Sequence, residues 1–63
     1  MNKYKYVTIV RTAKGFRAVE NCWKIPGHYW AIVWKSNVYR LKSEAIDVGR
    51  AYAENHNLKF KEE

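Results

Sequence analysis

The sequence contains little cysteine, proline or glycine, and these scarcities exclude several kinds of protein. Its 63 residues include one Cys, one Pro and three Gly. A disulfide scaffold needs at least two cysteines, so the chain must fold without one. A Cys/His zinc site needs about four ligands, whereas Cys22, His28 and His56 are the only candidates. We therefore expect neither a metal nor another cofactor.

Long apolar runs are also missing. No segment approaches the roughly 18 apolar residues of a membrane span, and Met1 to Lys5 lack the apolar stretch of a signal peptide. A single cysteine fits a reducing compartment. These features predict a cytoplasmic protein that does not associate with membranes.

Residues suited to catalysis are scarce. A chain this short rarely builds both a core and a preorganised cleft. Cys22 and His28 flank the predicted turn at Pro26 and suggest a nucleophile and its base, but no acid or amide is placed to orient the imidazole. We therefore expect no enzymatic activity, and interpret Cys22 as a buried thiol and His28 as a strand-end imidazole.

Aromatic residues are abundant: the chain has three Trp, five Tyr and two Phe. Each buried aromatic side chain removes roughly 150–250 Å² from water. This content predicts that residues 1–63 fold as one small domain. Self-association is the other source of stability for so short a chain, so both a monomer and a homodimer remain open.

The first two thirds of the chain have the composition of β-strands. A short turn at residues 13–15 contains Gly15, and Pro26-Gly27 favours a second turn. Segments rich in β-branched and aromatic residues predict strands at 3–12, 16–23 and 28–35, with a short fourth strand or an extension at 38–41.

The last third changes to a helical period. Ser43 is a suitable N-cap, and Asn57 can adopt the left-handed conformation that ends a helix. Gly49 lowers helix propensity, so we expect a close contact there. Leu58 and Phe60 predict a short terminal strand or a packed tail. One helical face collects Ala45, Val48, Gly49, Tyr52, Ala53 and His56. The predicted fold class is α+β: a three- to four-stranded antiparallel meander packed on one C-terminal helix, with a possible short terminal strand.

Charge is distributed unevenly between these two parts. Residues 1–42 contain nine Lys/Arg and one acid, Glu20, whereas residues 43–63 contain three Lys/Arg and five acids. The sheet is therefore basic and the helix mildly acidic. With the helix on one face of the sheet, the molecule should be electrically polarised.

Strand alternation assigns side chains to the two faces of the sheet. Placing the bulkiest sets beneath the helix buries Tyr6, Val10, Phe16, Ala18, Trp30, Ile32 and Trp34. The open face then carries Lys5, Arg11, Arg17 and Lys35 around Val7, Ile9, Val19, Trp23, Tyr29 and Val33. A β-bulge would reverse the phase of one strand.

The basic, aromatic sheet predicts a small protein that binds nucleic acid, with DNA favoured over RNA. Cationic side chains neutralise phosphates and aromatic rings stack on bases. The alternative is a small interaction or inhibitor protein, phage- or plasmid-borne, whose apolar open face binds another protein or a second copy. A third interpretation is that the lysines only protect sheet edges. The predicted site uses Lys5, Arg11, Arg17, Lys35 and Arg40 for phosphates and Trp23 and Tyr29 for stacking.

Part of the sequence resembles known DNA-binding domains. The matching features are Gly27 followed by Trp30-Ala31 and an apolar residue, a turn at Ser36-Asn37, an aromatic strand at Val38-Tyr39, and Glu44-Ala45 leading to Arg50-Ala51-Tyr52. They resemble the DNA-binding domain of plant ethylene-response-type factors and the arm-binding domain of some phage integrases. The resemblance implies a three-stranded sheet that packs on one helix and enters the major groove. It also implies groove contacts from Arg11, Arg17, Trp30 and Arg40, which would expose Trp30.

A second resemblance covers Trp30 to Phe60. A Trp-bearing strand, a Ser-Glu-Ala-Ile helix start and a terminal apolar strand resemble a group of short bacterial and phage domains of unknown function. This resemblance implies a fold and no activity.

Overall fold

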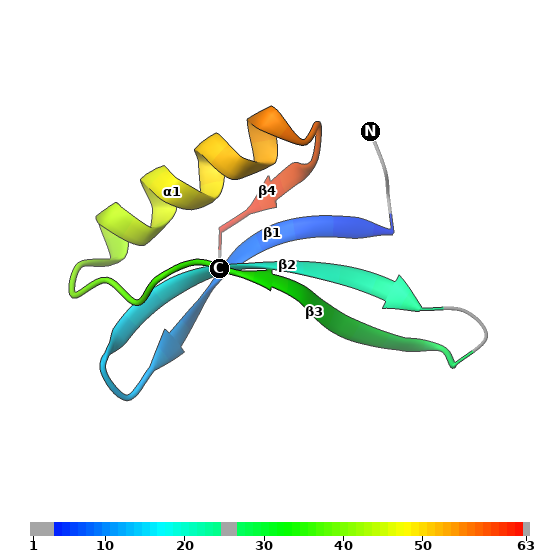
Figure 1. Ribbon diagram of the computed structural model, residues 1–63, viewed down its shortest axis with the longest axis horizontal. Coiled ribbons are helices and arrows are strands. Elements are labelled where there is room, and N and C mark those ends of the chain that lie inside the picture. Colours follow the sequence, from blue (N-terminus) through cyan, green and yellow to red (C-terminus); the bar gives the residue numbers. More distant parts are fainter. Residues whose placement is uncertain (1–3, 25–26, 63) are drawn as a thin grey trace.

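The computed structural model describes residues 4–24 and 27–62, which form a four-stranded sheet packed against one helix (Figure 1). The predicted strand start at Lys3 and the predicted break at Pro26 lie outside these residues. The elements are β1 (Lys5–Thr12), β2 (Gly15–Lys24), β3 (Tyr29–Lys35), α1 (Lys42–Asn55) and β4 (Lys59–Lys61). The strand order is β3-β2-β1-β4. The predicted α+β class and C-terminal helix are confirmed.

The terminal strand makes the sheet mixed. The first three strands form an antiparallel meander, as predicted. After β3 the chain crosses the sheet through α1, so β4 pairs with β1 in a parallel direction. The β2–β3 hairpin projects beyond α1 (Figure 1), and one end of the sheet therefore has no helical cover.

The side chain of Ser36 fixes the segment after β3 to β2. Ser36 accepts a hydrogen bond at Oγ from the Ala18 N–H (2.9 Å) and donates its own N–H to the Ala18 carbonyl (2.8 Å). Ser36 thereby satisfies both backbone groups of Ala18 where the regular ladder ends. Beyond it, Tyr39 exchanges two 2.7 Å backbone hydrogen bonds with Phe16. The segment predicted as a fourth strand is thus an isolated bridge that extends the line of β3.

The two ends of α1 differ in how well they were predicted. The N-cap is Leu41, with extended φ and ψ of −104° and 137° and no side-chain cap, so the predicted Ser43 cap is wrong. At the other end Asn57 has φ of 55°. The Leu58 N–H donates to the Ala53 carbonyl (2.7 Å) and the Asn57 N–H to the Glu54 carbonyl (3.3 Å). These bonds form a Schellman motif and confirm the predicted left-handed end.

Small residues let α1 approach the sheet closely. Its buried positions are Ala45, Gly49 and Ala53. A Cβ at Gly49 would lie 2.8 Å from Phe60 Cε1 and 3.1 Å from Ala18 Cβ. The predicted close contact at Gly49 is therefore confirmed.

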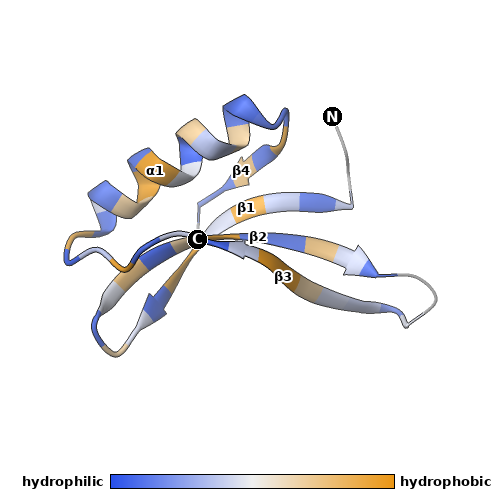
Figure 2. Cartoon of the chain, viewed as in Figure 1, coloured by the Kyte–Doolittle hydropathy of each residue, from blue (hydrophilic) through white to orange (hydrophobic). Residues whose placement is uncertain are grey.

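The predicted phase of β1 is wrong. In the register, Val7 lies opposite Glu20 and Ile9 opposite Ala18. Val7 and Ile9 are buried in the core beneath α1, where Tyr6 and Val10 were expected. Both faces of β1 carry apolar side chains, so alternation alone could not decide which face is covered. Figure 2 shows the hydrophobic residues distributed through the strands and α1.

A bulge divides β3 between the two faces. Glu20 lies opposite Trp34 while the next residue, Asn21, lies opposite Ile32, so Val33 is an extra residue on this strand. Trp34 faces α1 and stacks on Tyr52, with ring centroids 3.7 Å apart and planes 6° from parallel. Trp30 and Ile32 face away from α1, contrary to the prediction that all three residues lie beneath it.

Candidate nucleic-acid interface

The sheet face turned away from α1, here the outer face, carries side chains from all four strands. The pairing register assigns them, because directly paired residues project to the same side. The strand residues of the outer face are Tyr6, Thr8, Val10 and Thr12 of β1; Arg17, Val19, Asn21 and Trp23 of β2; Trp30, Ile32 and Lys35 of β3; and Lys59 and Lys61 of β4.

Three aromatic rings form a cluster at the hairpin end of the outer face. The Trp30 centroid lies 5.2 Å from that of Tyr6, at 74° between the ring planes, and 5.3 Å from that of Trp23, at 59°. We call Tyr6, Trp23 and Trp30 the ring cluster. Trp23 also contacts His28, at 6.2 Å. Trp30 remains 47% exposed, so much of its indole is available to a ligand.

Four cations share the face with these rings: Arg17, Lys35, Lys59 and Lys61. One cross-strand row runs from Lys61 through Thr8 and Val19 to Lys35. The two middle residues of this row, Thr8 and Val19, are 3% and 1% exposed. They are therefore not accessible to a ligand, whereas a lysine lies at each end of the row. Lys61 Nζ lies 4.5 Å from the Tyr6 centroid, which is a cation–π distance.

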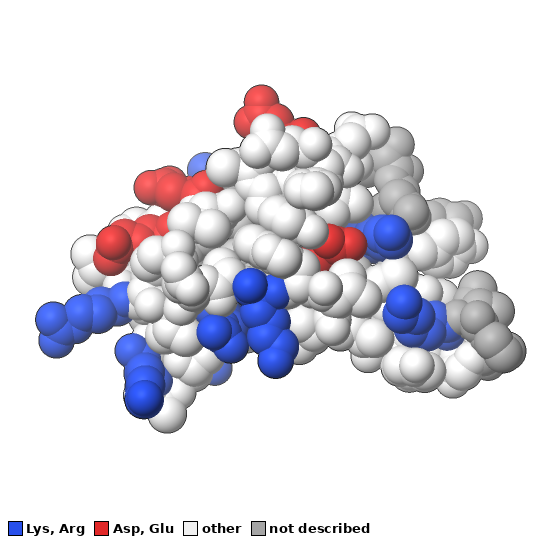
Figure 3. Space-filling view, viewed as in Figure 1, with Lys and Arg blue, Asp and Glu red and all other residues white. Residues whose placement is uncertain are grey.

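The described acids lie elsewhere. Glu20, the one acid of the β1–β3 meander, faces α1, is 7% exposed and accepts a 2.6 Å hydrogen bond from the Tyr52 hydroxyl. Burial, this hydrogen bond and the Glu20 charge together raise the pKa of Tyr52 to about 12. Three other acids are on α1, and Glu62 pairs with Arg50 at 3.7 Å. Figure 3 shows acidic groups over α1 and basic groups along the sheet below it, which is the polarity predicted from the sequence.

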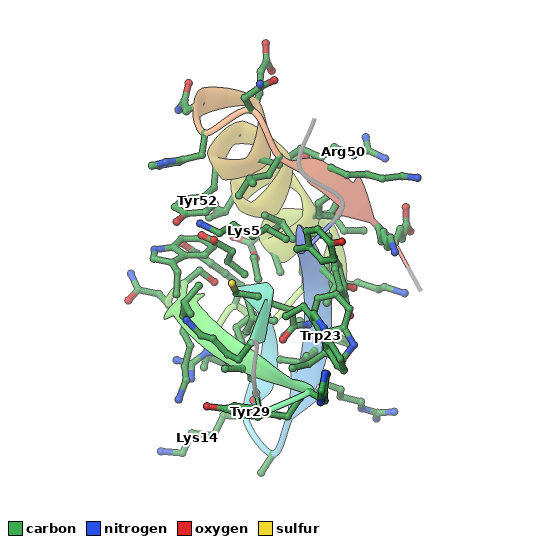
Figure 4. The ribbon with its side chains drawn as sticks, turned by 90° about the vertical axis from the view of Figure 1, so that its right-hand side faces the viewer. Lys5, Lys14, Trp23, Tyr29, Arg50 and Tyr52 are labelled. Carbon is green, nitrogen blue, oxygen red and sulfur yellow. The ribbon has the colours of Figure 1, made fainter. Side chains whose placement is uncertain are left out.

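The structure divides the predicted site residues between the two faces. Arg17, Trp23 and Lys35 are on the outer face, as expected. Lys5, which pairs with Cys22, is on the α1 side of the sheet. In Figure 4, Lys5 points toward Tyr52 beneath the helix, whereas Trp23 is on the opposite side. The outer-face placement predicted for Lys5 is wrong because the phase of β1 is reversed.

Two further predicted residues, Arg11 and Tyr29, also lie off the outer face. Arg11 pairs with Phe16 on the α1 side and, with Lys42, borders a hollow of about 260 Å³. Tyr29 pairs with Lys24 on that same side and is 55% exposed. Arg40 is exposed in the connection between β3 and α1. Arg11 and Tyr29 therefore do not share a surface with the ring cluster.

Among the aromatic and cationic residues of the outer face, the open face predicted from strand alternation lacked four: Tyr6, Trp30, Lys59 and Lys61. The alternation Lys59-Phe60-Lys61 was a usable signal, because a buried Phe60 would direct both lysines to the other side. Trp30 was assigned to the core by size. Trp30 is 47% exposed, so its assignment to the core is wrong.

The described residues show no arrangement typical of a metal site. Cys22 is buried and its thiol lies 3.7 Å from the Trp23 carbonyl, and no three His, Cys, Asp or Glu residues of residues 4–24 and 27–62 gather closely enough to hold a metal ion. In the same part of the chain, α1 is too short and too polar to cross a membrane. No protein-family model, curated protein or solved structure matches the chain at a significant level.

Proposed function

We propose that this protein binds nucleic acid on its outer face and has no catalytic activity. One observation carries the proposal: four cations and the ring cluster occupy a single sheet face on which no acid of the described residues lies. Cations supply sequence-independent attraction to phosphates, and exposed rings supply contacts to bases.

The number of cations sets the expected salt dependence. Each neutralised phosphate contributes about −0.7 to the slope of log affinity against log salt for a single strand. Contacts from Arg17, Lys35, Lys59 and Lys61 would therefore give a slope of about −3.

Charge reversal on the two faces tests the proposal. Arg17→Glu with Lys35→Glu removes two outer-face cations. Arg11→Glu with Lys24→Glu makes the same change in net charge on the α1 side of the sheet, where the register places both residues. We expect the first pair to weaken oligonucleotide binding and to reduce the salt slope to about half, since two of four phosphate contacts are lost. The control pair should leave the slope near its original value. Equal effects of both pairs would contradict an outer-face site.

The free edge of the sheet favours a second candidate function, the binding of another protein or a second copy. Within the described part of the chain, β3 pairs only with β2 and exposes apolar side chains: Tyr29 is 55% exposed, Ile32 49% and Val33 47%. Val33→Glu should abolish such a complex while oligonucleotide binding persists. Val19, also expected on the open face, is 1% exposed, so a charge there would test folding rather than a partner.

A further inference from the structure

We infer that the nucleic acid held by the outer face is single-stranded, with an unpaired base stacked on Trp30. This inference rests on the proposed function and adds the class of ligand. It is carried by the geometry of the ring cluster, the placement of the cations and the width of the sheet.

The ring cluster leaves ring surface available for stacking. Trp30 meets its two neighbours edge-on or tilted, at 74° and 59°, and keeps 47% of its surface exposed. Trp34, on the α1 side, instead uses a ring face in a parallel stack 3.7 Å from Tyr52. Trp30 therefore has the free surface on which an unpaired base can stack.

The cations stand where a backbone attached to such a base would pass. Lys59 lies opposite Tyr6 in the register, and Lys61 Nζ is over the Tyr6 ring. Lys35 is on the other edge of the face, in the same strand as Trp30. A single strand crossing the strands of the sheet would meet cations at both edges and the ring cluster beside them.

A duplex fits this face less well for two reasons. Bases in a duplex are stacked on one another, so their faces are not available to Trp30. Strands lie about 4.8 Å apart, so four strands span roughly 14 Å before side chains are added, whereas the major groove is about 12 Å wide. The whole outer face therefore cannot enter the groove, although the β2–β3 hairpin alone would fit.

The test compares labelled probes by fluorescence anisotropy at one salt concentration. The probes are oligo(dT) and oligo(rU) of twelve nucleotides, an abasic deoxyribose-phosphate strand of the same length, and a twelve-base-pair duplex. We expect oligo(dT) or oligo(rU) to bind roughly 5- to 150-fold more tightly than the abasic strand, which is the fold-change of one stacking contact. The duplex should bind more weakly than the preferred single strand, and the two single strands distinguish DNA from RNA.

Variants at Trp30 separate stacking from apolar contact. Trp30→Leu should reduce the preference for oligo(dT) over the abasic strand to near one, whereas Trp30→Phe should retain it. Tyr29→Leu is the matched control, because Tyr29 is an exposed aromatic residue on the other side of the sheet. If Trp30→Leu loses the native circular dichroism spectrum, Trp23→Leu replaces it in the comparison.

The outcomes distinguish this inference from the proposed function. Duplex binding as tight as that of the preferred single strand, or equal affinity for that strand and the abasic strand, would overturn the single-strand inference and leave nucleic-acid binding intact. Binding to none of the probes at low salt would overturn the proposed function itself.

Discussion

Removal of the Tyr52 hydroxyl should destabilise the fold, because this hydroxyl donates a hydrogen bond to the buried carboxylate of Glu20. In Tyr52→Phe the ring that stacks on Trp34 is kept, and only the donor 2.6 Å from Glu20 Oε1 is lost. A hydrogen bond to a charged group is worth about 1.5–3 kcal/mol. Because Tyr52 is only half-buried, we expect about 1.5–2 kcal/mol, at the lower end of that range. A domain of this size has roughly 3–5 kcal/mol in total, so Tm should fall by about 10 °C.

Urea unfolding followed by far-UV circular dichroism measures this change. Circular dichroism is preferred to tryptophan fluorescence because Trp34 contacts the substituted ring. Tyr29→Phe removes the same hydroxyl from an exposed residue and should leave the unfolding free energy within about 0.5 kcal/mol of the original value.

A double-mutant cycle attributes the loss to the hydrogen bond itself. When Glu20→Leu removes the acceptor, Tyr52→Phe should cost much less, because no buried charge is left without its donor. If Tyr52→Phe changes stability by less than about 0.5 kcal/mol in the original chain, or by the same amount in both backgrounds, the Tyr52–Glu20 hydrogen bond does not stabilise the fold as expected.

Three further predictions concern the same side of the molecule. Folding raises the pKa of Tyr52 from 10.0 to about 12. The protonated hydroxyl therefore contributes its full stabilisation below pH 10, and this stabilisation is lost as pH rises toward 12. Absorbance at 295 nm should show one phenol that titrates later than the others, and Tyr52→Phe should remove it. Gly49→Leu should destabilise the fold by about 1–3 kcal/mol in urea unfolding, since Phe60 and Ala18 already occupy the space; a neutral result would contradict the close approach. Asn57→Ala should lower Tm through the cost of a left-handed conformation, about 1 kcal/mol, whereas Asn57→Gly should not; equal effects of the two substitutions would refute this explanation.

The order and type of the elements could be predicted because local signals agree with the fold. The change from strand composition to a helical stripe separated β3 from α1, and Asn57 correctly indicated where the helix ends. The polarity of the molecule also followed from the sequence, because acids are concentrated after residue 42.

The composition of the interface could be predicted only in part, because it depends on pairing between strands. Tyr6 and Val7 are both apolar enough for a core, and only the register with β2 decides which of them α1 covers. In a regular strand Trp30 and Trp34 would project to the same face of the sheet. The extra residue Val33 places them on opposite faces. Neither a register nor a bulge leaves a local signal in a strand that is apolar on both faces.

The indole N–H signals of the three tryptophans test the central claim most directly. Two of these side chains, Trp23 and Trp30, are on the outer face, and Trp34 is packed against Tyr52 on the other side. In a titration with oligo(dT) followed by ¹H–¹⁵N correlation spectra, we expect the Trp23 and Trp30 indole signals to shift together and the Trp34 signal to stay in place. A shift confined to Trp34, or the absence of any indole shift in the presence of bound oligonucleotide, would contradict an outer-face site.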